Sequence, residues 1–410
     1  MNQFERNLEK YADLAIRTGV NIQENQELLI MAPIETAPFV RKVAKKAYEA
    51  GAKNVHVDWS DEDLTLTKFL LAPDEALKEF PLWKAKGYVE MAEGGCAVLS
   101  ISASNPDLLK NIDPEKIALS NKARAIALED FRAYMQNNKI SWSIVSIPTA
   151  AWATKVFPTT TEEVAVEKLW DAIFSVTRVH EEDPIKAWEQ HLTNLNTKLD
   201  YLNGKKYMKL HFKAPGTDLT VELPKGHIWL GADANNEKGA SFIANIPTEE
   251  VFTLPAKYGV DGILASKKPL NYNGTIIDNF SLTFEKGKVV DFTAETGYET
   301  LKNMLNTDEG ARYLGEVALV PHDSPISNSN ILFYNTLFDE NASCHFAFGS
   351  AYPVCLEGGE NLSKEDLEKQ GCNTSLIHVD FMVGCAEMAI DGIQADGSIE
   401  PIFRNGNWVF

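Results

Sequence analysis

Hydrophobic positions in the first third of the chain alternate between helical and strand-like spacing. Residues 4–19 and 37–52 repeat apolar residues on one helical face, and Gly19 and Gly51 are expected to end these helices. Further helices are expected over residues 61–93 and 121–139. Four short apolar or alternating runs predict strands, at residues 26–33, 53–60, 96–104 and 140–148.

Strands separated by helices of this length are typical of βαβ units, which place their strands in a parallel sheet. We therefore expect an open α/β domain with a mostly parallel sheet over residues 1–185. Helices are also expected over residues 160–176, where Thr160 and Glu163 resemble a capping box, and over residues 184–203, which could join two domains.

The pattern changes after Gly204, where short alternating runs are separated by turns that contain proline and glycine. The pattern of this half predicts a mixed, largely antiparallel α+β domain over residues 186–410, with helices near residues 296–306 and 364–370. The overall fold class is thus α/β with two domains, which agrees with a length of 410 residues, too long for one compact core.

Charge and composition exclude several classes of function. The formal net charge of −19 argues against nucleic-acid binding, and it is compatible with attracting the ammonium end of a peptide. We find no signal-peptide pattern and no apolar run of the ~18 residues that a membrane span needs. The five cysteines have no zinc-binding spacing, so free thiols in a reducing cytoplasm are expected.

Candidate metal ligands are concentrated between residues 316 and 380. They are Glu316, Glu340, His345, His378 and Asp380. Carboxylates mixed with imidazoles suit Zn²⁺, Co²⁺ or Mn²⁺ better than Ca²⁺, and the set is large enough for two ions. This inventory points to metal-dependent hydrolysis.

His378 and Asp380 are two residues apart in an apolar run that predicts a strand. Their side chains should therefore lie on the same face and could reach one ion. An ordinary hydrogen-bonded pair on a strand surface is the alternative. A carboxylate beside the apolar run of residues 317–320 is costly to bury unless it is paired, so Glu316 is either a ligand or an exposed strand end. Glu340 could equally belong to an acidic turn.

Tyr352 follows His345 after a bend expected at Gly349 and Ser350. The bend could return the phenol towards the histidine, where it could ligate weakly or donate a hydrogen bond to a developing oxyanion. A core aromatic residue is the alternative.

Glu249 and Glu250 lie side by side in an extended segment between two prolines. Adjacent residues of an extended chain face opposite ways, so one glutamate could bind metal while the other acts as the general base. A loop with solvated acids is the alternative. Motifs of other enzyme classes (HExxH, GxSxG, a Walker A loop, and GxGxxG after a strand) do not occur, and the neighbours His322, Asp323 and Ser324 are no evidence for a triad.

Four blocks in this order closely resemble the signatures of the aminopeptidase T and aminopeptidase S family, the bacterial thermophilic metalloaminopeptidases. They are NIPTEEVFTLP, GEVALVPHDSPIS, NILFYNTLFDENASCHFAFGSAYP and SLIHVDFMVG, and the resemblance spans essentially the whole chain.

The resemblance implies a site for two divalent ions (Zn, Co or Mn, with Mg possible) that removes N-terminal residues from peptides through an activated water. The implied ligands are Glu250, Glu316, His345, Tyr352, His378 and Asp380, with Glu316 bridging and Glu340 a further contact. The family also implies a cytoplasmic homodimer. Glu249 is our assignment of the base from geometry. A hydrolase of non-peptide amides or esters and a non-catalytic metal- or peptide-binding protein remain alternatives, and the sequence identifies neither the native metal nor the preferred N-terminal residue.

Overall fold

The computed structural model describes residues 2–103 and 105–410, so Ser104, at the end of the expected strand 96–104, lies outside the described residues. The chain forms two compact units. The first contains residues 1–112, 119–194 and 232–248, and the second contains residues 113–118, 195–231 and 249–410. The fold class expected from the sequence is confirmed, whereas the domain boundary between residues 185 and 186 stays a prediction.

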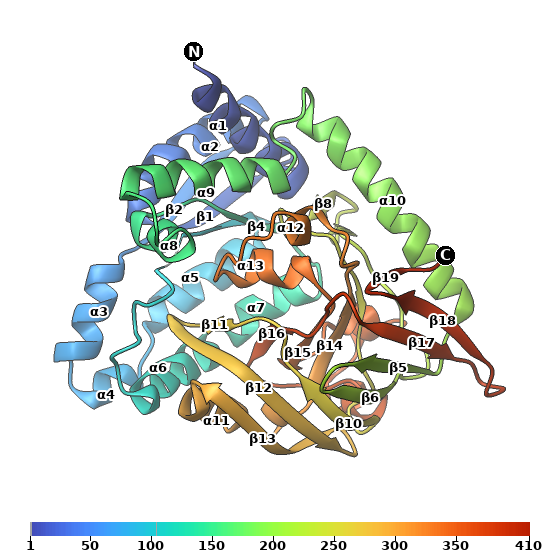
Figure 1. The fold of residues 1–410 in the computed structure, drawn as a ribbon. Helices are drawn as coiled ribbons and strands as arrows, with labels where there is room; N and C mark the ends of the chain where they lie inside the picture. Colours follow the sequence, from blue (N-terminus) through green and yellow to red (C-terminus); the bar gives the residue numbers. More distant parts are fainter. Residues whose placement is uncertain (1, 104) are drawn as a thin grey trace. The chain divides into compact units, whose positions relative to one another are not determined.

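The first unit is built on a four-stranded parallel sheet. Its strands have the order β2-β1-β3-β4 and consist of β1 (Glu27–Pro33), β2 (Asn54–Ser60), β3 (Ala97–Ser102) and β4 (Trp142–Ser146). The central strand β1 is almost continuously apolar because both faces of a parallel sheet are covered. In Figure 1, α1, α2 and α9 lie on one side of this sheet, and α5 and α7 lie on the other.

The helices in the first half of the chain are short to medium in length. They are α1 (Gln3–Leu14), a π-helical turn (Ala15–Gly19), α2 (Ala37–Glu49), α3 (Glu62–Leu71), α4 (Asp74–Leu77), α5 (Leu82–Glu93), α6 (Pro114–Ala127), α7 (Glu129–Gln136), α8 (Ala150–Val156), α9 (Glu162–Val176) and α10 (Pro184–Lys205).

Three helix predictions were wrong in detail. The single helix expected over residues 61–93 is three helices, because Pro73 and Pro81 each form the extended N-cap of a new helix. The helix expected over residues 121–139 begins earlier, at Pro114, and breaks at Leu128. The N-cap of α9 is Thr161, without a side-chain hydrogen bond, in place of the expected capping box at Thr160.

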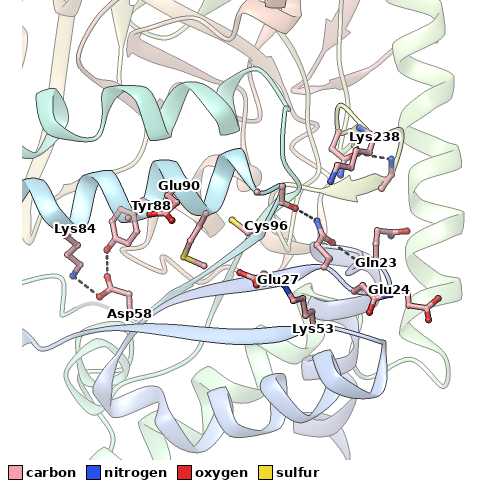
Figure 2. Close-up of a pocket in the computed structure, with 18 of the residues that line it drawn as sticks. Gln23, Glu24, Glu27, Lys53, Asp58, Lys84, Tyr88, Glu90, Cys96 and Lys238 are labelled. Atoms are coloured by element: carbon pink, nitrogen blue, oxygen red, sulfur yellow. Dashed lines mark hydrogen bonds and ion pairs between the residues drawn. The ribbon is translucent and has the colours of Figure 1, made fainter.

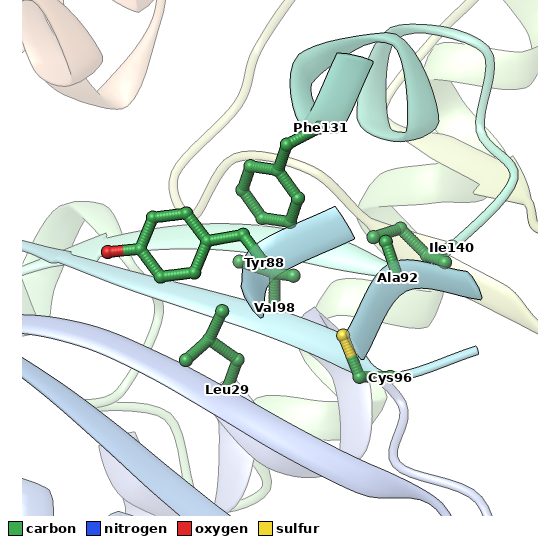
Figure 3. Packing of buried hydrophobic residues seen from close by; sticks show 7 residues of the cluster. All are labelled: Leu29, Tyr88, Ala92, Cys96, Val98, Phe131 and Ile140. Carbon is green, nitrogen blue, oxygen red and sulfur yellow. The ribbon is translucent and has the colours of Figure 1, made fainter. Parts of the chain in front are cut away.

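A hydrophobic cluster joins the sheet of the first unit to α5 and α7, as Figure 3 shows. Tyr88 of α5 and Phe131 of α7 pack with ring centroids 5.2 Å apart, above Leu29 of β1 and Val98 of β3. Phe131 is 2% exposed, so its ring contributes almost its full apolar surface to this core.

The second unit contains a large antiparallel sheet. Its strands follow the order β11-β12-β10-β6-β5-β17-β18-β19, and β13 pairs with β12. The strands are β5 (Lys209–Ala214), β6 (Thr217–Glu222), β10 (Val260–Ala265), β11 (Leu270–Tyr272), β12 (Thr275–Glu285), β13 (Lys288–Thr296), β17 (Ala389–Ile393), β18 (Ile399–Arg404) and β19 (Asn407–Trp408). The remaining helices are α11 (Tyr298–Leu305), α12 (Pro325–Asn328), α13 (Thr336–Asp339) and α14 (Lys364–Lys369).

A second, smaller antiparallel sheet in this unit has the order β16-β15-β14-β9. It consists of β9 (Val251–Thr253), β14 (Leu314–Leu319), β15 (His345–Gly349) and β16 (His378–Met382), and β14, β15 and β16 are seen side by side in Figure 1. Every residue of β14 and β15 is buried. The two remaining strands, β7 (Asp233–Asn235) and β8 (Ser241–Ile243), pair with each other in the first unit.

All five cysteines are free, and four of them are buried. Burial raises the pKa of the Cys344 and Cys372 thiols to about 12, so these groups remain protonated at neutral pH. Within the described part of the chain, no helix has the length and apolar character required to cross a membrane.

We expect Phe131→Ala to lower the free energy of unfolding of the first unit by about 3–5 kcal/mol, because it leaves a cavity between α5, α7 and the sheet. Leu64→Ala on α3 is the control, since Leu64 is 70% exposed and its loss should change stability by no more than ~0.5 kcal/mol. Chemical denaturation of both variants measures the difference, and equal effects would contradict this description of the core.

Candidate metal centre

One face of the small antiparallel sheet collects the acidic and imidazole side chains. Directly opposite residues share a face, and Glu316 of β14, Ala347 of β15 and Asp380 of β16 form one such row. His345 and His378 are each two residues from a member of this row, so they share its face. The small side chain of Ala347 leaves space between the two carboxylates on either side of it.

Histidine nitrogens and carboxylate oxygens meet at short distances on this face. His345 Nε2 lies 2.9 Å from Glu250 Oε2 and 3.5 Å from Glu316 Oε1. His378 Nε2 lies 3.5 Å from Glu316 Oε2 and 3.4 Å from Asp380 Oδ1. The side chain of Glu316 therefore stands between the two imidazoles, with one oxygen towards each.

Backbone carbonyls determine how both imidazole rings face the acids. His345 Nδ1 lies 3.1 Å from the Ser343 carbonyl oxygen, and His378 Nδ1 lies 2.7 Å from the Ser350 carbonyl oxygen. A carbonyl only accepts hydrogen bonds, so each Nδ1 must carry the proton. In a neutral ring, Nε2 then presents its lone pair to the carboxylates, which is the orientation of a metal-ligating histidine.

The acids of this face are almost removed from water. Glu250, Glu316 and Glu340 are each between 5% and 7% exposed. Burial, with the nearby charge of Asp380, raises the pKa of Glu316 to about 7, and the same two causes raise the pKa of Glu340 well above its ordinary value. Four acids thus meet two imidazoles, and ionising all four would leave buried negative charge without a partner among these groups.

The imidazoles respond in the opposite direction. Burial alone would lower the pKa of His345, but the adjacent Glu250 and Glu316 outweigh it and raise that pKa well above the ordinary value. Asp380 and Glu316 similarly outweigh burial and raise the pKa of His378 to about 9. Burial would raise the pKa of Asp380, but His378 holds it below its usual value. All three pKa shifts have the same cause: a positive imidazolium charge beside the carboxylates stabilises the ionised form of both groups.

Two buried oxygen atoms indicate that a cation fits this place. Glu250 Oε2 and Asp380 Oδ1 are buried and accept no hydrogen bond, although each has a histidine nitrogen nearby. A buried carboxylate oxygen without a donor is costly unless it coordinates an ion. The oxygen and imidazole donors are those that Zn²⁺, Co²⁺ and Mn²⁺ accept. The residues present therefore fit a divalent metal.

Five of the seven predicted ligands form two overlapping groups, and Glu340 and Tyr352 belong to neither. Glu250, Glu316 and His345 offer atoms within 4.8 Å of one another, and so do Glu316, His378 and Asp380. Glu316 belongs to both groups. The alternatives of an exposed strand end for Glu316 and of a solvated loop for the Glu249–Glu250 pair were wrong, since all three side chains are buried.

Glu340 and Glu249 lie outside both groups, although each is buried. Glu340 begins a 3-10 turn, Glu340–Ala342, directly after α13, so the expected acidic turn exists but is buried. The nearby charges of Asp380 and Glu250 act on it, which places it beside the metal groups. Glu249 and Glu250 directly precede β9, which begins at Val251.

The bend expected after β15 is present. Tyr352 contacts His378, a different histidine from His345, towards which we expected the bend to return it. Gly349 has φ +93°, and a Cβ atom there would lie 2.2 Å from the Ile377 carbonyl oxygen, so only glycine fits. The ring centroids of Tyr352 and His378 are 4.8 Å apart in an edge-on arrangement. Burial and the surrounding carboxylates raise the pKa of the Tyr352 phenol well above its ordinary value, so its hydroxyl keeps its proton.

His322, Asp323 and Ser324 form no catalytic triad. Ser324 is the N-cap of α12 and accepts a hydrogen bond from the Ser327 amide at 3.1 Å. The His322 ring contacts Ser327 Oγ at 3.4 Å.

Sequence reasoning missed two residues of this region, Ala347 and Asn341. Ala347 has no chemistry of its own, and only the strand register places it between Glu316 and Asp380. Asn341 is fully buried and contacts both Glu249 and Glu340. Its position directly after two acids is the one signal that could have drawn attention to it.

A separate pocket of about 740 Å³ lies in the first unit, beside α5 and the start of β1 (Figure 2). Two of its lysines pair with acids of the same pocket, since Lys84 lies 2.8 Å from Asp58 and Lys53 lies 3.3 Å from Glu27. None of the predicted site residues lines it. The candidate chemistry therefore belongs to the sheet of the second unit.

Known proteins resemble this chain over its whole length. The chain is 56% identical over 410 residues to Aminopeptidase 2 of Geobacillus stearothermophilus, covering 100% of this chain and 99% of that protein. It is 55% identical to Aminopeptidase AmpS of Bacillus subtilis (strain 168), covering 100% of both chains. The structure of wild-type AmpT from Thermus thermophilus superposes with a TM-score of 0.91 at 44% identity, covering 99% of this chain and 100% of that one. The thermophilic metalloprotease (M29) family matches residues 4–408, and the chain therefore belongs to this family.

Proposed function

We propose that this chain is a metal-dependent aminopeptidase that hydrolyses the N-terminal residue from peptides. The observation that carries the proposal is the pair of imidazoles held through Nδ1, with Nε2 facing buried carboxylates. The relatives from Geobacillus, Bacillus and Thermus are named aminopeptidases, which supports the reaction class.

We propose that two ions bind, one in each of the two ligand groups, with Glu316 shared between them. The order of the donors supports this, because Glu316 directs one oxygen towards each imidazole. Zn²⁺, Co²⁺ and Mn²⁺ suit the donors best, and Mg²⁺ is compatible with the carboxylates. When bound, such ions supply Lewis acidity, which lowers the pKa of water and polarises a carbonyl group.

The remaining steps are assigned to side chains of this chain. Glu249 takes the proton of the attacking water as the new carbon–oxygen bond forms, and it returns that proton to the nitrogen of the leaving amine as the carbon–nitrogen bond breaks. The protonated hydroxyl of Tyr352 donates a hydrogen bond to the developing oxyanion. The buried carboxylates around the site, including Glu340, attract the α-ammonium group of the substrate.

We also propose that the enzyme is a cytoplasmic homodimer. The five free cysteines support a reducing compartment. The homodimer rests on the resemblance of the chain to the aminopeptidase T family. The substrate would be a peptide with a free N-terminus.

His378→Ala should lower metal content and abolish turnover of an aminoacyl chromogenic substrate while the fold stays intact, because it removes a ligand from one group. Elemental analysis, circular dichroism and the chromogenic assay measure the three properties. His211→Ala is the matched control, since His211 lies in the same unit and pairs with the exposed Asp218. Full activity of His378→Ala, or of the wild-type enzyme after its metal is stripped, would contradict the proposal.

Glu249→Gln should keep the metal content and lower kcat by about 10²-fold or more, the usual scale for the loss of a general base. Glu285→Gln serves as the control, because Glu285 is an exposed acid at the end of β12. If Glu249→Gln retains the wild-type rate, another group moves the proton.

Peptides with a free amino terminus should be cleaved, whereas the same peptides after N-acetylation should not, because acetylation removes the ammonium group that the carboxylates attract. Product analysis by mass spectrometry measures both reactions. Equal cleavage of the two substrates would favour a hydrolase of amides or esters without exopeptidase specificity. Bound metal without any hydrolysis would favour a binding protein.

A further inference from the structure

The side chain of Asn341 lies between the two acids that fall outside the metal groups. Its Oδ1 accepts a hydrogen bond from the Glu249 backbone N–H at 2.7 Å. Its Nδ2 donates to Glu340 Oε1 at 3.3 Å and to the Leu337 carbonyl oxygen at 3.2 Å. The residue is 0% exposed, so water does not compete for these contacts.

The three contacts agree on one orientation of the amide. If the amide were flipped, Nδ2 would face the N–H of Glu249, and Oδ1 would face the oxygens of Glu340 and Leu337. Donor would then oppose donor and acceptor would oppose acceptor. The side chain is therefore held in a defined direction by both of its ends.

The segment that carries Asn341 is itself well supported. Ser324 Oγ donates to the Asn341 carbonyl oxygen at 3.4 Å, which ties the turn Glu340–Ala342 to the start of α12. The buried Asp339 accepts hydrogen bonds from the backbone N–H groups of Phe333 at 2.9 Å and Asn335 at 3.0 Å. A turn that is held by hydrogen bonds on both sides moves little, so it can keep the residues that it contacts in place.

The oxygen end of the Asn341 amide contacts the chain directly before Glu250, a candidate metal ligand. The Glu249 N–H belongs to the peptide group that directly precedes Glu250, and Glu250 Oε2 lies 2.9 Å from His345 Nε2. The segment before β9 has no regular pairing of its own at these two residues. The hydrogen bond to Asn341 therefore helps to fix the direction of the Glu249 backbone N–H.

We propose that Asn341 is a positioning residue for the reaction, which fixes Glu249 and Glu340 relative to each other and to the metal centre. This inference rests on the proposed function. A small error in the placement of a reacting group costs a large factor in rate even when binding is unchanged. A residue with this role should therefore affect kcat far more than KM or metal content.

Asn341→Ala should lower kcat by about 10- to 100-fold, with KM and metal content close to those of the wild-type enzyme. In the metal-free protein, hydrogen–deuterium exchange over residues 246–254 should become faster, because the Glu249 N–H loses its acceptor. Asn203→Ala is the matched control. Asn203 makes two hydrogen bonds of 2.9 Å to the backbone of Trp229 in the same unit, so its loss should affect stability and leave kcat unchanged.

Asn341→Asp changes only the nitrogen end of the amide, so it tests the two hydrogen-bonding ends separately. It also keeps the experiment informative if Asn341→Ala does not fold. It retains an acceptor for the Glu249 N–H but places an oxygen against Glu340 Oε1, so exchange over residues 246–254 should stay slow while kcat falls.

The inference is overturned if Asn341→Ala keeps its kcat, if its kcat falls without faster exchange, or if Asn203→Ala loses kcat to the same extent. Fast exchange in Asn341→Asp would also overturn it. A wild-type enzyme that cleaves no peptide would instead refute the proposed function, and the exchange measurements would still report on Asn341.

Discussion

The excess of acids over basic groups on one face of a small antiparallel sheet is the constraint on which the site depends. Elsewhere in the protein, acids pair with lysines, as Asp58 does with Lys84 in a partly exposed ion pair. On this face, the ion-pair partners of Glu316 are the two histidines, His345 and His378. Both rings donate through Nδ1 to backbone carbonyls, so a neutral ring offers the acids only a lone pair. A divalent cation resolves this conflict without protonating the ligands.

The sheet makes such a concentration of charge possible because its geometry is repetitive. Alternate residues of a strand share a face, and antiparallel register sets which residues of neighbouring strands lie opposite each other. Glu316 lies on the inner strand β14 and Asp380 on β16, with the methyl group of Ala347 between them. The strands β14 and β15 also bury this face, since every residue of both strands is covered. His378 and Asp380 of β16 remain partly exposed, so the face combines a covered base with some access to solvent. Electrostatic interactions are stronger where water is excluded.

Several features of the site could be predicted from local sequence. The spacing of His378 and Asp380 within an apolar run predicted a strand with both side chains on one face, and β16 confirms that strand. Gly349 marked the bend that redirects the chain towards Tyr352. The alternation of strands and helices likewise predicted the parallel sheet of the first unit. The helix breaks at Pro73 and Pro81 were missed, although a proline within a helical pattern is itself the signal for a break.

The sequence by itself determined which residue types are present and which local faces they occupy, since strand and helix periodicity are properties of a few consecutive residues. Only the tertiary structure decided that Glu250 reaches His345, that the Ser343 and Ser350 carbonyls orient the imidazoles, and that Asn341 contacts two acids. These contacts depend on cross-strand register and on turns that approach from distant parts of the chain. Local periodicity does not encode them, because register is settled by the packing of whole strands against one another.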